Sequence, residues 1–486
     1  MALRSPQQFI ESLRDGREVY VRGQRVADVT RHPYLRIGIE TAAVDYRVAQ
    51  DPQCGSFAVV EEDGEPISRF FQAPRTPDDL LKRRELIEHG SRLCCGFPPF
   101  AKEGGGDALN AVLVASRHAD KGCETNYHAR ALEYRRYLYK NDLSVAIAMT
   151  DVKGDRALRP GQQPDPDHYL HIVEERPDGI VVRGAKAHLT TGPYTNEILV
   201  LPTRNMTAEE RHYAVCFAVP ANAPGLKMVC KEEPYENRNP FDYPVSARYD
   251  MIEALVIFDD VFVPRERVFL SGEHEYATHF VEMFANYHRV TAATYKYPYL
   301  ELMVGAALLM AEANGTARVG HVRDKIAWLV LYAETVAALT RSACLNPTQD
   351  PDTGMVYPDP VTSNAVKYYF ADNYHAAIKA VQDIAGGIVV TGPAEEDYRN
   401  PSIGPLVEKY LRGSSKVSGE ARLRTIRLVK DLTASALSGF WEVTTLHAEG
   451  SLAAERLAVL ASGDLERYRS QARRAAGLGV PDAGRT

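Results

Sequence analysis

The sequence predicts a multidomain α+β protein, with a mainly helical N-terminal domain, a central β domain and a C-terminal helical bundle. The chain has 486 residues, enough for two to four domains at roughly 100–200 residues per domain. Apolar residues recur at helical spacing in both terminal parts, whereas they alternate with polar residues in the middle. We therefore expect domains at residues 1–145, 146–272 and 273–486, the last ending in a frayed tail beyond Gly463.

The N-terminal part is mostly helical in its pattern. Residues 6–13 and 76–81 each begin a helix, because each places a proline in the first turn. Residues 18–26 alternate around Gly23 and predict a strand–turn–strand hairpin. We expect this hairpin to decorate the helical domain.

A β pattern occupies the middle of the chain. Residues 169–174 and 180–186 flank Pro177-Asp178-Gly179 and predict a hairpin. Turn residues separate the other expected strands, which are 198–201, 213–219, 226–230 and 254–258. Short strands at regular spacing indicate a small barrel or sandwich. We take a β-barrel that ends near Pro264 as the predicted form.

Long amphipathic segments follow residue 275. Two stripes at spacings of three and four are Val322, Ile326, Leu329, Val330, Ala333, Val336 and Leu339, and Val366, Phe370, Tyr374, Ile378 and Val381. Four or more such segments predict a helical bundle. The most apolar stretch, 302–311, is shorter than the roughly 20 residues that span a bilayer, so it is expected to be a buried helix.

Composition excludes several classes of function. The 57 Lys and Arg residues and 64 Asp and Glu residues give a net charge of −7, which offers no electrostatic case for nucleic acid or an anionic membrane. The seven cysteines are odd in number and contain no CxxC, so reduced thiols are expected. The N-terminus has no secretory signal pattern, which predicts a cytoplasmic protein. Small-molecule chemistry is the remaining expectation.

One candidate cofactor loop joins the first two domains. It contains Met149, Thr150, Lys153, Asp155 and Arg156. Backbone N–H groups beside Thr150 could bind a heterocycle edge, and the two cations could balance an anionic ring or a phosphate. The alternative is a polar interdomain turn.

Two further hydroxyl side chains follow a predicted strand. Thr190 and Thr191 could donate hydrogen bonds to a ligand, or they could be ordinary loop hydroxyls. The chain has neither GxGxxG nor GxxxxGK[ST], so a nucleotide cofactor would bind in another way.

The densest cluster of reactive side chains begins the bundle. His288, Thr291, Ala292, Tyr295 and Lys296 lie at helical spacings that place them on one face. A base and a cation on one face indicate acid–base chemistry, and the alternative is a structural histidine.

Glu253 precedes an apolar strand and is either a partner of this cluster or a surface carboxylate. Cys94 and Cys95 are more consistent with core thiols than with a redox or metal element. A zinc site has no support, because histidine and cysteine never recur with ligand spacing.

Four segments of the chain resemble the 4-hydroxyphenylacetate 3-hydroxylase family, and the resemblance runs nearly end to end. They are 149–156, 180–186, 239–248 and 255–264. The family includes 4-hydroxybutyryl-CoA dehydratase, which residues 126–128, 179–188 and 287–289 resemble more closely. The resemblance implies an acyl-CoA dehydrogenase-like architecture with a β-barrel and a four-helix bundle, assembled as a homotetramer or homodimer.

The resemblance also implies FAD, held between the β domain and the bundle. The loop 149–156 and Thr190 and Thr191 would lie near the flavin. Residues 382–387, with Gln382, Gly386 and Gly387, are similar to the motif that receives the adenine dinucleotide part, often from a neighbouring subunit. Two glycines permit close backbone approach, although on their own they are also typical of a helix C-cap.

The two branches of the family demand different residues. The hydroxylase branch implies molecular oxygen, FADH2 from a separate reductase, and a phenol held by Arg, Tyr and His. Residues 96–102 lack the Arg and Tyr and 145–148 lack the His, so plain 4-hydroxyphenylacetate is not the expected substrate.

The dehydratase branch implies a [4Fe-4S] cluster held by three cysteines and a histidine. His288 matches the histidine and Cys94 or Cys95 matches one cysteine, but Tyr295 replaces the last, beside a matching Lys296. We therefore expect no iron–sulfur cluster. Thr190 and Glu253 match active-site positions of this branch, whereas Ala292 and Thr444 stand where it has a tyrosine and another acid.

The resulting hypothesis is the oxygenase component of a two-component, FADH2-using monooxygenase of a phenolic, heteroaromatic or carrier-bound substrate. His288 is the candidate acid–base with Glu253 as its electrostatic partner, and Lys296 and Thr190 complete the catalytic set. Arg289 and Tyr295 are candidate substrate-binding residues, or they form structural contacts. The alternatives are an iron-free dehydratase or double-bond isomerase of an acyl-CoA, and a catalytically inactive flavin-binding subunit.

Overall fold

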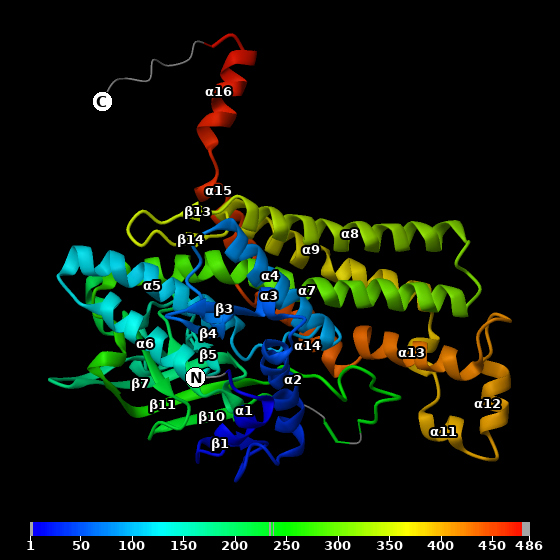
Figure 1. Cartoon of the computed structure of the whole chain (residues 1–486). Coiled ribbons are helices and arrows are strands. Elements are labelled where there is room, and N and C mark those ends of the chain that lie inside the picture. The colour runs from blue at the N-terminus through cyan, green and yellow to red at the C-terminus, as the bar shows by residue number, and fades with distance from the viewer. Residues whose placement is uncertain (1–2, 233–234, 237, 479–486) are drawn as a thin grey trace.

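The computed structural model describes residues 3–232, 235–236 and 238–478. Long helices cross the molecule above two β sheets (Figure 1). The N-terminal helices lie beside the long helices and the sheets (Figure 1). Met1, Ala2 and the last eight residues of the predicted tail lie outside the described residues.

The predicted N-terminal helices are confirmed. The principal helices are α1 (Pro6–Ser12), α2 (Pro33–Gln50), α4 (Pro77–Leu93), α5 (Glu103–Cys123) and α6 (Tyr127–Asn141), with a short α3 (Gly55–Ala58) and a hairpin of β3 (Val59–Glu62) and β4 (Glu65–Ser68) between α2 and α4. Ser5 and Thr76 cap α1 and α4, each with a capping box ahead of the first-turn proline. Local sequence chemistry therefore sets these two helix starts.

The hairpin near the N-terminus belongs to the β domain, so its predicted place on the helical domain is wrong. Its strands are β1 (Glu18–Val21) and β2 (Gln24–Arg25), and β1 pairs in parallel with β10 (Leu226–Cys230). This pairing covers an edge of the larger sheet, which would otherwise expose unpaired backbone groups.

The β domain consists of two sheets. The larger has the order β2-β1-β10-β11-β7-β6 and adds β6 (His171–Arg176), β7 (Gly179–Thr190) and β11 (Glu253–Pro264) to the strands above. The smaller has the order β12-β9-β8-β5 and contains β5 (Val145–Ala148), β8 (Glu197–Val200), β9 (Val215–Pro220) and β12 (Val268–Ser271). Strand β12 extends the β region beyond the predicted limit at Pro264.

No closed barrel is found among the described strands. Closure requires the two edge strands of one sheet to pair with each other. In each of these sheets the first and last strands of the order are not paired with each other. Side chains of both sheets, such as Val182 and Val256 of the larger and Ile198 and Phe217 of the smaller, share one hydrophobic core. The strands therefore form a sandwich, the other form that their spacing allowed.

The predicted helical bundle is confirmed. Its long helices are α7 (Ala277–Ala313), α8 (Gly320–Leu345), α9 (Pro360–Ala385) and α13 (Gly419–Thr433), with short helices α10 (Ile388–Thr391), α11 (Glu395–Arg399) and α12 (Gly404–Leu411) before α13. Residues 302–311 lie within α7 and bury one face, while Leu308 and Leu309 are exposed. None of the helices in the described ranges combines the length and apolar character needed to cross a membrane.

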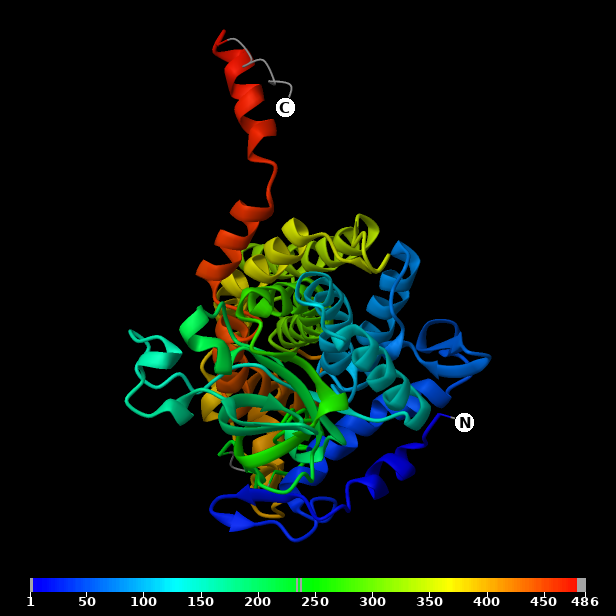
Figure 2. The same cartoon turned by 90° about the vertical axis from the view of Figure 1, so that its left-hand side faces the viewer.

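The C-terminal region leaves the bundle as an arm. Helices α14 (Ala436–His447) and α15 (Leu452–Ser462) pack near α9, and α16 (Leu465–Ala475) stands away from the body without a buried residue (Figure 2). Up to Ala475 the predicted frayed tail is therefore helical. All seven cysteines are free thiols, as expected.

Gly96 fixes the approach of residues 94–102 to α7. Its φ is +87°, and a Cβ at this position would lie 2.5 Å from the Cα of Tyr299. We expect Gly96→Ala to destabilise the protein by about 2–4 kcal/mol through backbone strain and overpacking, measured by urea unfolding. Gly305→Ala is the matched control, because Gly305 lies in α7 with nothing within 4 Å of its Cβ position. Equal stability of the two variants would contradict the expectation.

Candidate active site

His288 lies on α7 and is held by a carboxylate of α5. Its Nδ1 is 3.0 Å from Oδ2 of Asp107, and the Nη2 of Arg83 donates to Oδ1 of the same aspartate at 2.7 Å. Burial favours the neutral aspartic acid, but the charges of Arg83 and His288 hold the pKa of Asp107 below its ordinary value. Asp107 is thus a partner of His288 that the sequence did not indicate, and the electrostatic role of Glu253 toward His288 stays a prediction. Asp107 fixes Nδ1, so that Nε2 is available for proton transfer.

Aromatic rings enclose the imidazole. Phe284 stacks on His288 with ring centroids 4.7 Å apart, and the edge of Phe100 approaches at 5.9 Å. Phe100 also contacts Tyr295, at 5.8 Å. Its backbone φ is +58°, a conformation that costs free energy in a non-glycine residue and is often found at functional sites. The rings give the histidine an apolar wall.

Glu449 organises the next part of the cluster. Lys296 donates to its Oε2 at 2.8 Å and Tyr295 donates to its Oε1 at 2.8 Å, while the Nζ of Lys367 is 4.0 Å from Oε2. Burial alone would raise the pKa of Glu449, but the charges of Lys296 and Lys367 lower it to about 2. The residue therefore stays ionised in a buried setting.

Sequence reasoning missed Glu449. It named Thr444 at the position of a second acid, whereas Glu449, in the α14–α15 linker, is the acid that contacts Lys296 and Tyr295. Glu449 has a φ of +60° and precedes Gly450, and Ser451 then caps α15. The glycine and the N-cap serine were the available signal, since both are typical of a tight linker.

Glu253 and Thr190 lie side by side on neighbouring strands of the larger sheet. They are register partners of β11 and β7, and the Thr190 hydroxyl donates to Oε1 of Glu253 at 2.8 Å. The other oxygen, Oε2, is buried and has no hydrogen-bond partner among the described residues. Burial is the main reason that the pKa of Glu253 rises to about 7. An orphaned buried oxygen is consistent with a site that binds a ligand.

The raised pKa of Glu253 predicts a pH-dependent stability. Because the folded state holds this proton more tightly than an ordinary glutamate with pKa 4.5, the stabilisation is complete below pH 4.5 and is lost as the pH rises through 7. Glu253→Gln should therefore gain stability relative to the wild type with rising pH, by up to about 3 kcal/mol. Urea unfolding of both proteins at several pH values would check this, and parallel curves would contradict it.

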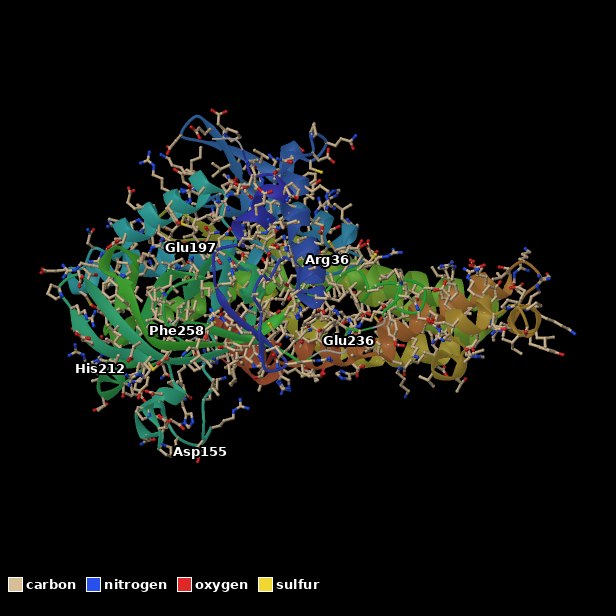
Figure 3. The ribbon with its side chains drawn as sticks, turned by 90° about the horizontal axis from the view of Figure 1, so that it is seen from below. Arg36, Asp155, Glu197, His212, Glu236 and Phe258 are labelled. Carbon is tan, nitrogen blue, oxygen red and sulfur yellow. The ribbon has the colours of Figure 1, made fainter. Side chains whose placement is uncertain are left out.

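The predicted cofactor loop has a buried root and an exposed tip. The carbonyl of Met149 accepts a hydrogen bond from Lys186 at 2.9 Å, and the carbonyl of Thr150 accepts one from the backbone N–H of Ala187 at 2.7 Å. Lys153 and the glycine after it both have positive φ. Asp155 lies on a segment that projects from the sheets (Figure 3), and Arg156 beside it is exposed.

His188 is an exposed residue near the end of β7, in the neighbourhood of Lys153 of this loop and His447 of α14. Partial desolvation lowers its pKa, and the charges of Lys153 and His447 lower it further. His188 and Thr191 both have positive φ, 59° and 62°. The Thr191 hydroxyl donates to the carbonyl of Thr190 at 2.7 Å and lies 3.4 Å from that of Phe100. The strained end of β7 therefore adjoins the aromatic wall.

The remaining predicted cofactor residues lie elsewhere. Gln382 donates to the carbonyl of Thr433 at 2.7 Å near the end of α9, and Gly386 and Gly387 are exposed, with nothing within 4 Å of the point where a Cβ would stand. This end of α9 is at the opposite end of the bundle from the sheets (Figure 1). Within one chain, these three residues therefore lie apart from the other predicted cofactor residues, which are the loop 149–156 with Thr190 and Thr191.

Arg289 has structural partners. Its guanidinium donates to the side chain of Asn364 and, at 3.0 Å, to the backbone carbonyl of Glu449. A Cβ at Gly450 would lie 2.8 Å from its Nη2. The arginine therefore holds the α14–α15 linker, and a role in substrate binding stays a prediction.

The residues present do not fit a [4Fe-4S] cluster. The resemblance finds only one of the three cysteine ligands, Cys94 or Cys95, and Tyr295 stands at the position of the last, although a cluster normally requires a nearly complete set of thiolates. The Phe100 ring stands in contact with His288 and Tyr295, in the space between two positions that the resemblance assigns to ligands. Among the described residues, no group of three or more His, Cys, Asp and Glu side chains could hold a metal ion.

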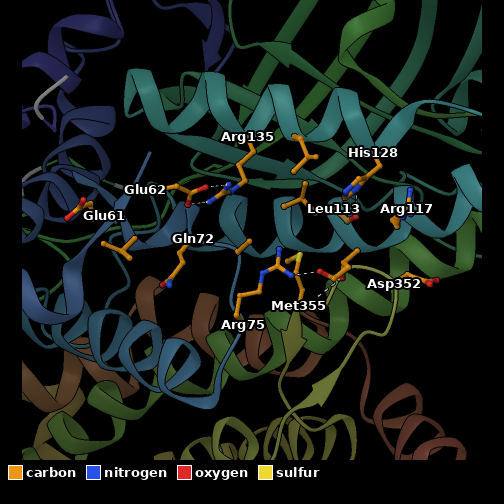
Figure 4. A pocket seen from close by; sticks show the side chains of 14 residues that line it. Glu61, Glu62, Gln72, Arg75, Leu113, Arg117, His128, Arg135, Asp352 and Met355 are labelled. Atoms are coloured by element: carbon orange, nitrogen blue, oxygen red, sulfur yellow. Dashed lines mark hydrogen bonds and ion pairs between the residues drawn. The ribbon is translucent and has the colours of Figure 1, made fainter. Parts of the chain in front are cut away.

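A separate cavity of about 640 Å³ opens beside α5 and α6 (Figure 4). Its lining includes Arg75, Arg117 and His128, and Arg135 at one end is paired with Glu62. None of the predicted site residues lines it. The acid–base cluster and this cavity are therefore different places.

A helical layer, two packed sheets and a helical bundle follow one another along the chain, and this order is that of the acyl-CoA dehydrogenase-like fold. The chain belongs to the 4-hydroxyphenylacetate 3-hydroxylase family. The family's N-terminal domain matches residues 5–270 and its C-terminal domain matches residues 277–477.

Relatives from both branches of the family match over nearly the whole chain. A 4-hydroxybutyryl-CoA dehydratase/vinylacetyl-CoA-Δ-isomerase of Clostridium aminobutyricum is 34% identical, over 98% of this chain and 100% of its own. A 4-hydroxyphenylacetate 3-monooxygenase oxygenase component of Thermus thermophilus is 33% identical, over 90% of this chain and 89% of its own. A solved oxygenase component of that monooxygenase, complexed with FAD, has a TM-score of 0.90 at 29% identity and covers 97% of this chain and 98% of its own.

Proposed function

We propose that this protein is the oxygenase component of a two-component, FADH2-dependent monooxygenase acting on a phenolic, heteroaromatic or carrier-bound substrate. One observation carries the choice between the branches. The Phe100 ring occupies the space beside His288 and Tyr295 that an iron–sulfur cluster would need, while the His288–Asp107 and Glu253–Thr190 pairs are intact.

FAD fits the residues present in two places. The root of the loop at Met149 and Thr150, with Lys153, Thr190 and Thr191, would hold the flavin, and Gln382, Gly386 and Gly387 would receive the adenine dinucleotide part. The orphaned Oε2 of Glu253 and the open space at the two glycines support this assignment. FAD, when bound and reduced, supplies the electrons for reaction with molecular oxygen.

Because the two groups lie at opposite ends of the bundle in one chain, each FAD would be held by two copies. This supports a homodimer or homotetramer. A separate flavin reductase would supply the reduced cofactor, as the oxygenase components among the relatives imply.

The chain's own residues suit proton transfer from a phenol. Asp107 orients His288 and stabilises the imidazolium that forms when Nε2 accepts the phenolic proton. Phe100 and Phe284 exclude water from the imidazole. Ionised Glu449 fixes Tyr295 and Lys296, which would contact the substrate or the flavin from the same helix face. Glu253, with its raised pKa, can carry or release a proton near neutral pH.

The test is aerobic turnover with a flavin reductase, NADH and FAD, in ¹⁸O2, over a panel of free and carrier-bound phenols. We expect incorporation of one labelled oxygen atom into a phenol other than plain 4-hydroxyphenylacetate, because the residues that resemblance assigns to that substrate are absent. Catalase is included so that free peroxide does not oxidise the phenols. Absence of label in every compound would count against the proposal.

The second candidate is an iron-free, redox-neutral isomerase or dehydratase of an acyl-CoA. The 34% identity with the dehydratase over the full length of both chains favours it, as do Glu253, Thr190 and His288 at positions that match. Anaerobic incubation with FAD and vinylacetyl-CoA would show double-bond migration if this candidate is correct. Retained FAD binding with neither reaction, in the wild type as in a His288 variant, would instead indicate a flavin-binding subunit without catalysis.

A further inference from the structure

A continuous row of aromatic rings runs from the candidate active site across the helical bundle. The ring contacts, in order, are Tyr295–Trp441, Trp441–Tyr299, Tyr299–Tyr374, Tyr374–Phe370, Phe370–Tyr332 and Tyr332–Trp328, with a side contact Tyr332–Tyr369. We propose that these side chains are a one-electron relay that carries oxidising equivalents from the active site to the outer face of α8 and α9. The inference rests on the proposed oxygen chemistry.

The contacts are close enough for direct electron exchange. Successive centroids lie 6.5, 5.2, 6.5, 5.6, 5.9 and 5.7 Å apart, within the roughly 4.5–7 Å of rings in contact. The row crosses from α7 to α14, returns to α7 at Tyr299, and then passes through α9 to α8. Helix α9 packs against α7, α8 and α14. Electron tunnelling falls steeply with distance, so a series of short steps is faster than one long step across the bundle.

The residue types suit oxidation. Tyrosine and tryptophan are the most readily oxidised aromatic side chains, and both tryptophans of the chain lie on the row. Trp441 stands next to the site, and Trp328 stands at the outer end, where it and Tyr369 are only partly buried. Phe370 is harder to oxidise than tyrosine and lies in contact with both Tyr374 and Tyr332. The two tyrosines are also close to each other, since burial raises the pKa of Tyr332 and the nearby Tyr374 raises it further.

The first tyrosine has a place for its proton. A phenol loses a proton when it is oxidised, and the Tyr295 hydroxyl already donates to the ionised carboxylate of Glu449 at 2.8 Å. The hydroxyls of Tyr299 and Tyr332 donate to backbone carbonyls of Leu432 and Phe370, at 3.2 and 2.5 Å. Carbonyls do not accept a full proton, so Tyr295 is the natural entry point.

A hydroperoxyl radical, which is oxygen that has gained one electron from reduced flavin and one proton, forms when no substrate is hydroxylated. It takes one electron from Tyr295 and one proton from solvent, and becomes hydrogen peroxide. The phenolic proton moves to Glu449. Trp441 then returns an electron to Tyr295, the proton moves back, and the vacancy passes outward to Trp328. An external thiol gives one electron to Trp328 and a proton to solvent, and two thiyl radicals combine to a disulfide.

The test maps radicals during turnover without substrate. The holoenzyme is supplied with FAD, NADH, a flavin reductase and oxygen, together with a nitrone spin trap, catalase and superoxide dismutase, and adducts are located by mass spectrometry. We expect adducts on Trp328 or Tyr369 in the wild type. In Trp441→Phe we expect these outer adducts to fall to the level of an anaerobic sample, and oxidation of Tyr295 to increase.

Oxygen uptake in the same samples separates the two proposals. No uptake would mean that the proposed oxygen chemistry has failed, whereas uptake with outer adducts that are missing, or unchanged in Trp441→Phe, would overturn the relay. Tyr374→Phe should reproduce the loss and decides the question if Trp441→Phe does not fold. Tyr169→Phe is the matched control, because Tyr169 is a buried tyrosine in contact with Tyr213 of the β domain, away from the row.

Discussion

Replacing His288 by Gln is expected to lower kcat/KM by about 10²–10⁴-fold, the contribution that general acid–base catalysis typically makes. Gln keeps a hydrogen-bond donor near Asp107 and much of the volume between Phe100 and Phe284, so that the loss reports proton transfer and not packing. The measurement is labelled product formation with the phenol that the ¹⁸O2 panel identifies.

Two further variants define what this loss means. Asp107→Asn should also reduce kcat/KM, because the imidazole loses the carboxylate that orients it and stabilises its cation. His375→Gln is the matched control, since His375 is half exposed beside Glu442 and outside the site, and it should retain wild-type activity. A His288→Gln protein within twofold of the wild type would remove His288 from the mechanism, whatever Asp107→Asn does.

The sequence predicted the elements of the fold better than their partners. The starts of α1 and α4 follow from Ser5, Thr76 and first-turn prolines, all within one helical turn. The place of β1 depends on its pairing with β10, about two hundred residues later, and no local pattern encodes that pairing. Barrel and sandwich share the same alternation of side chains, so strand spacing alone could not separate them.

The same distinction applies to the candidate site. Helical spacing was sufficient to place His288, Tyr295 and Lys296 on one face, because α7 is regular through this stretch. Asp107 and Glu449 could not be found in this way. Each is more than 150 residues from the side chain that it contacts, and each reaches the site only through packing of its own element against α7. Long-range partners of a reactive side chain are therefore what the structure adds.

Glu449→Gln is expected to destabilise the protein by about 3–5 kcal/mol near neutral pH, the usual cost of removing one partner of a buried ion pair. The variant leaves the fully buried Lys296 without its carboxylate, whereas Lys367 keeps an ion pair with Glu455 at 3.2 Å. The pKa of Glu449 is lowered to about 2, so its contribution is present above the ordinary value of 4.5 and is lost as the pH falls toward 2. Urea unfolding should therefore show a gap from the wild type that is constant between pH 6 and 8 and closes in acid.

A double-mutant cycle distinguishes an ion pair from simple packing. If the cost of Glu449→Gln comes from the stranded lysine, adding Lys296→Met should recover part of it, and the double variant should be more stable than the sum of the single losses predicts. Glu442→Gln is the matched control on the preceding helix, because Glu442 is partly exposed and lies 3.7 Å from His375, where an ion pair is worth less than about 1 kcal/mol. Strict additivity in the cycle would mean that Glu449 fills space without pairing. Ionised Glu449 would then lose its place as the proton acceptor of Tyr295, so the same measurement bears on both the site and the relay.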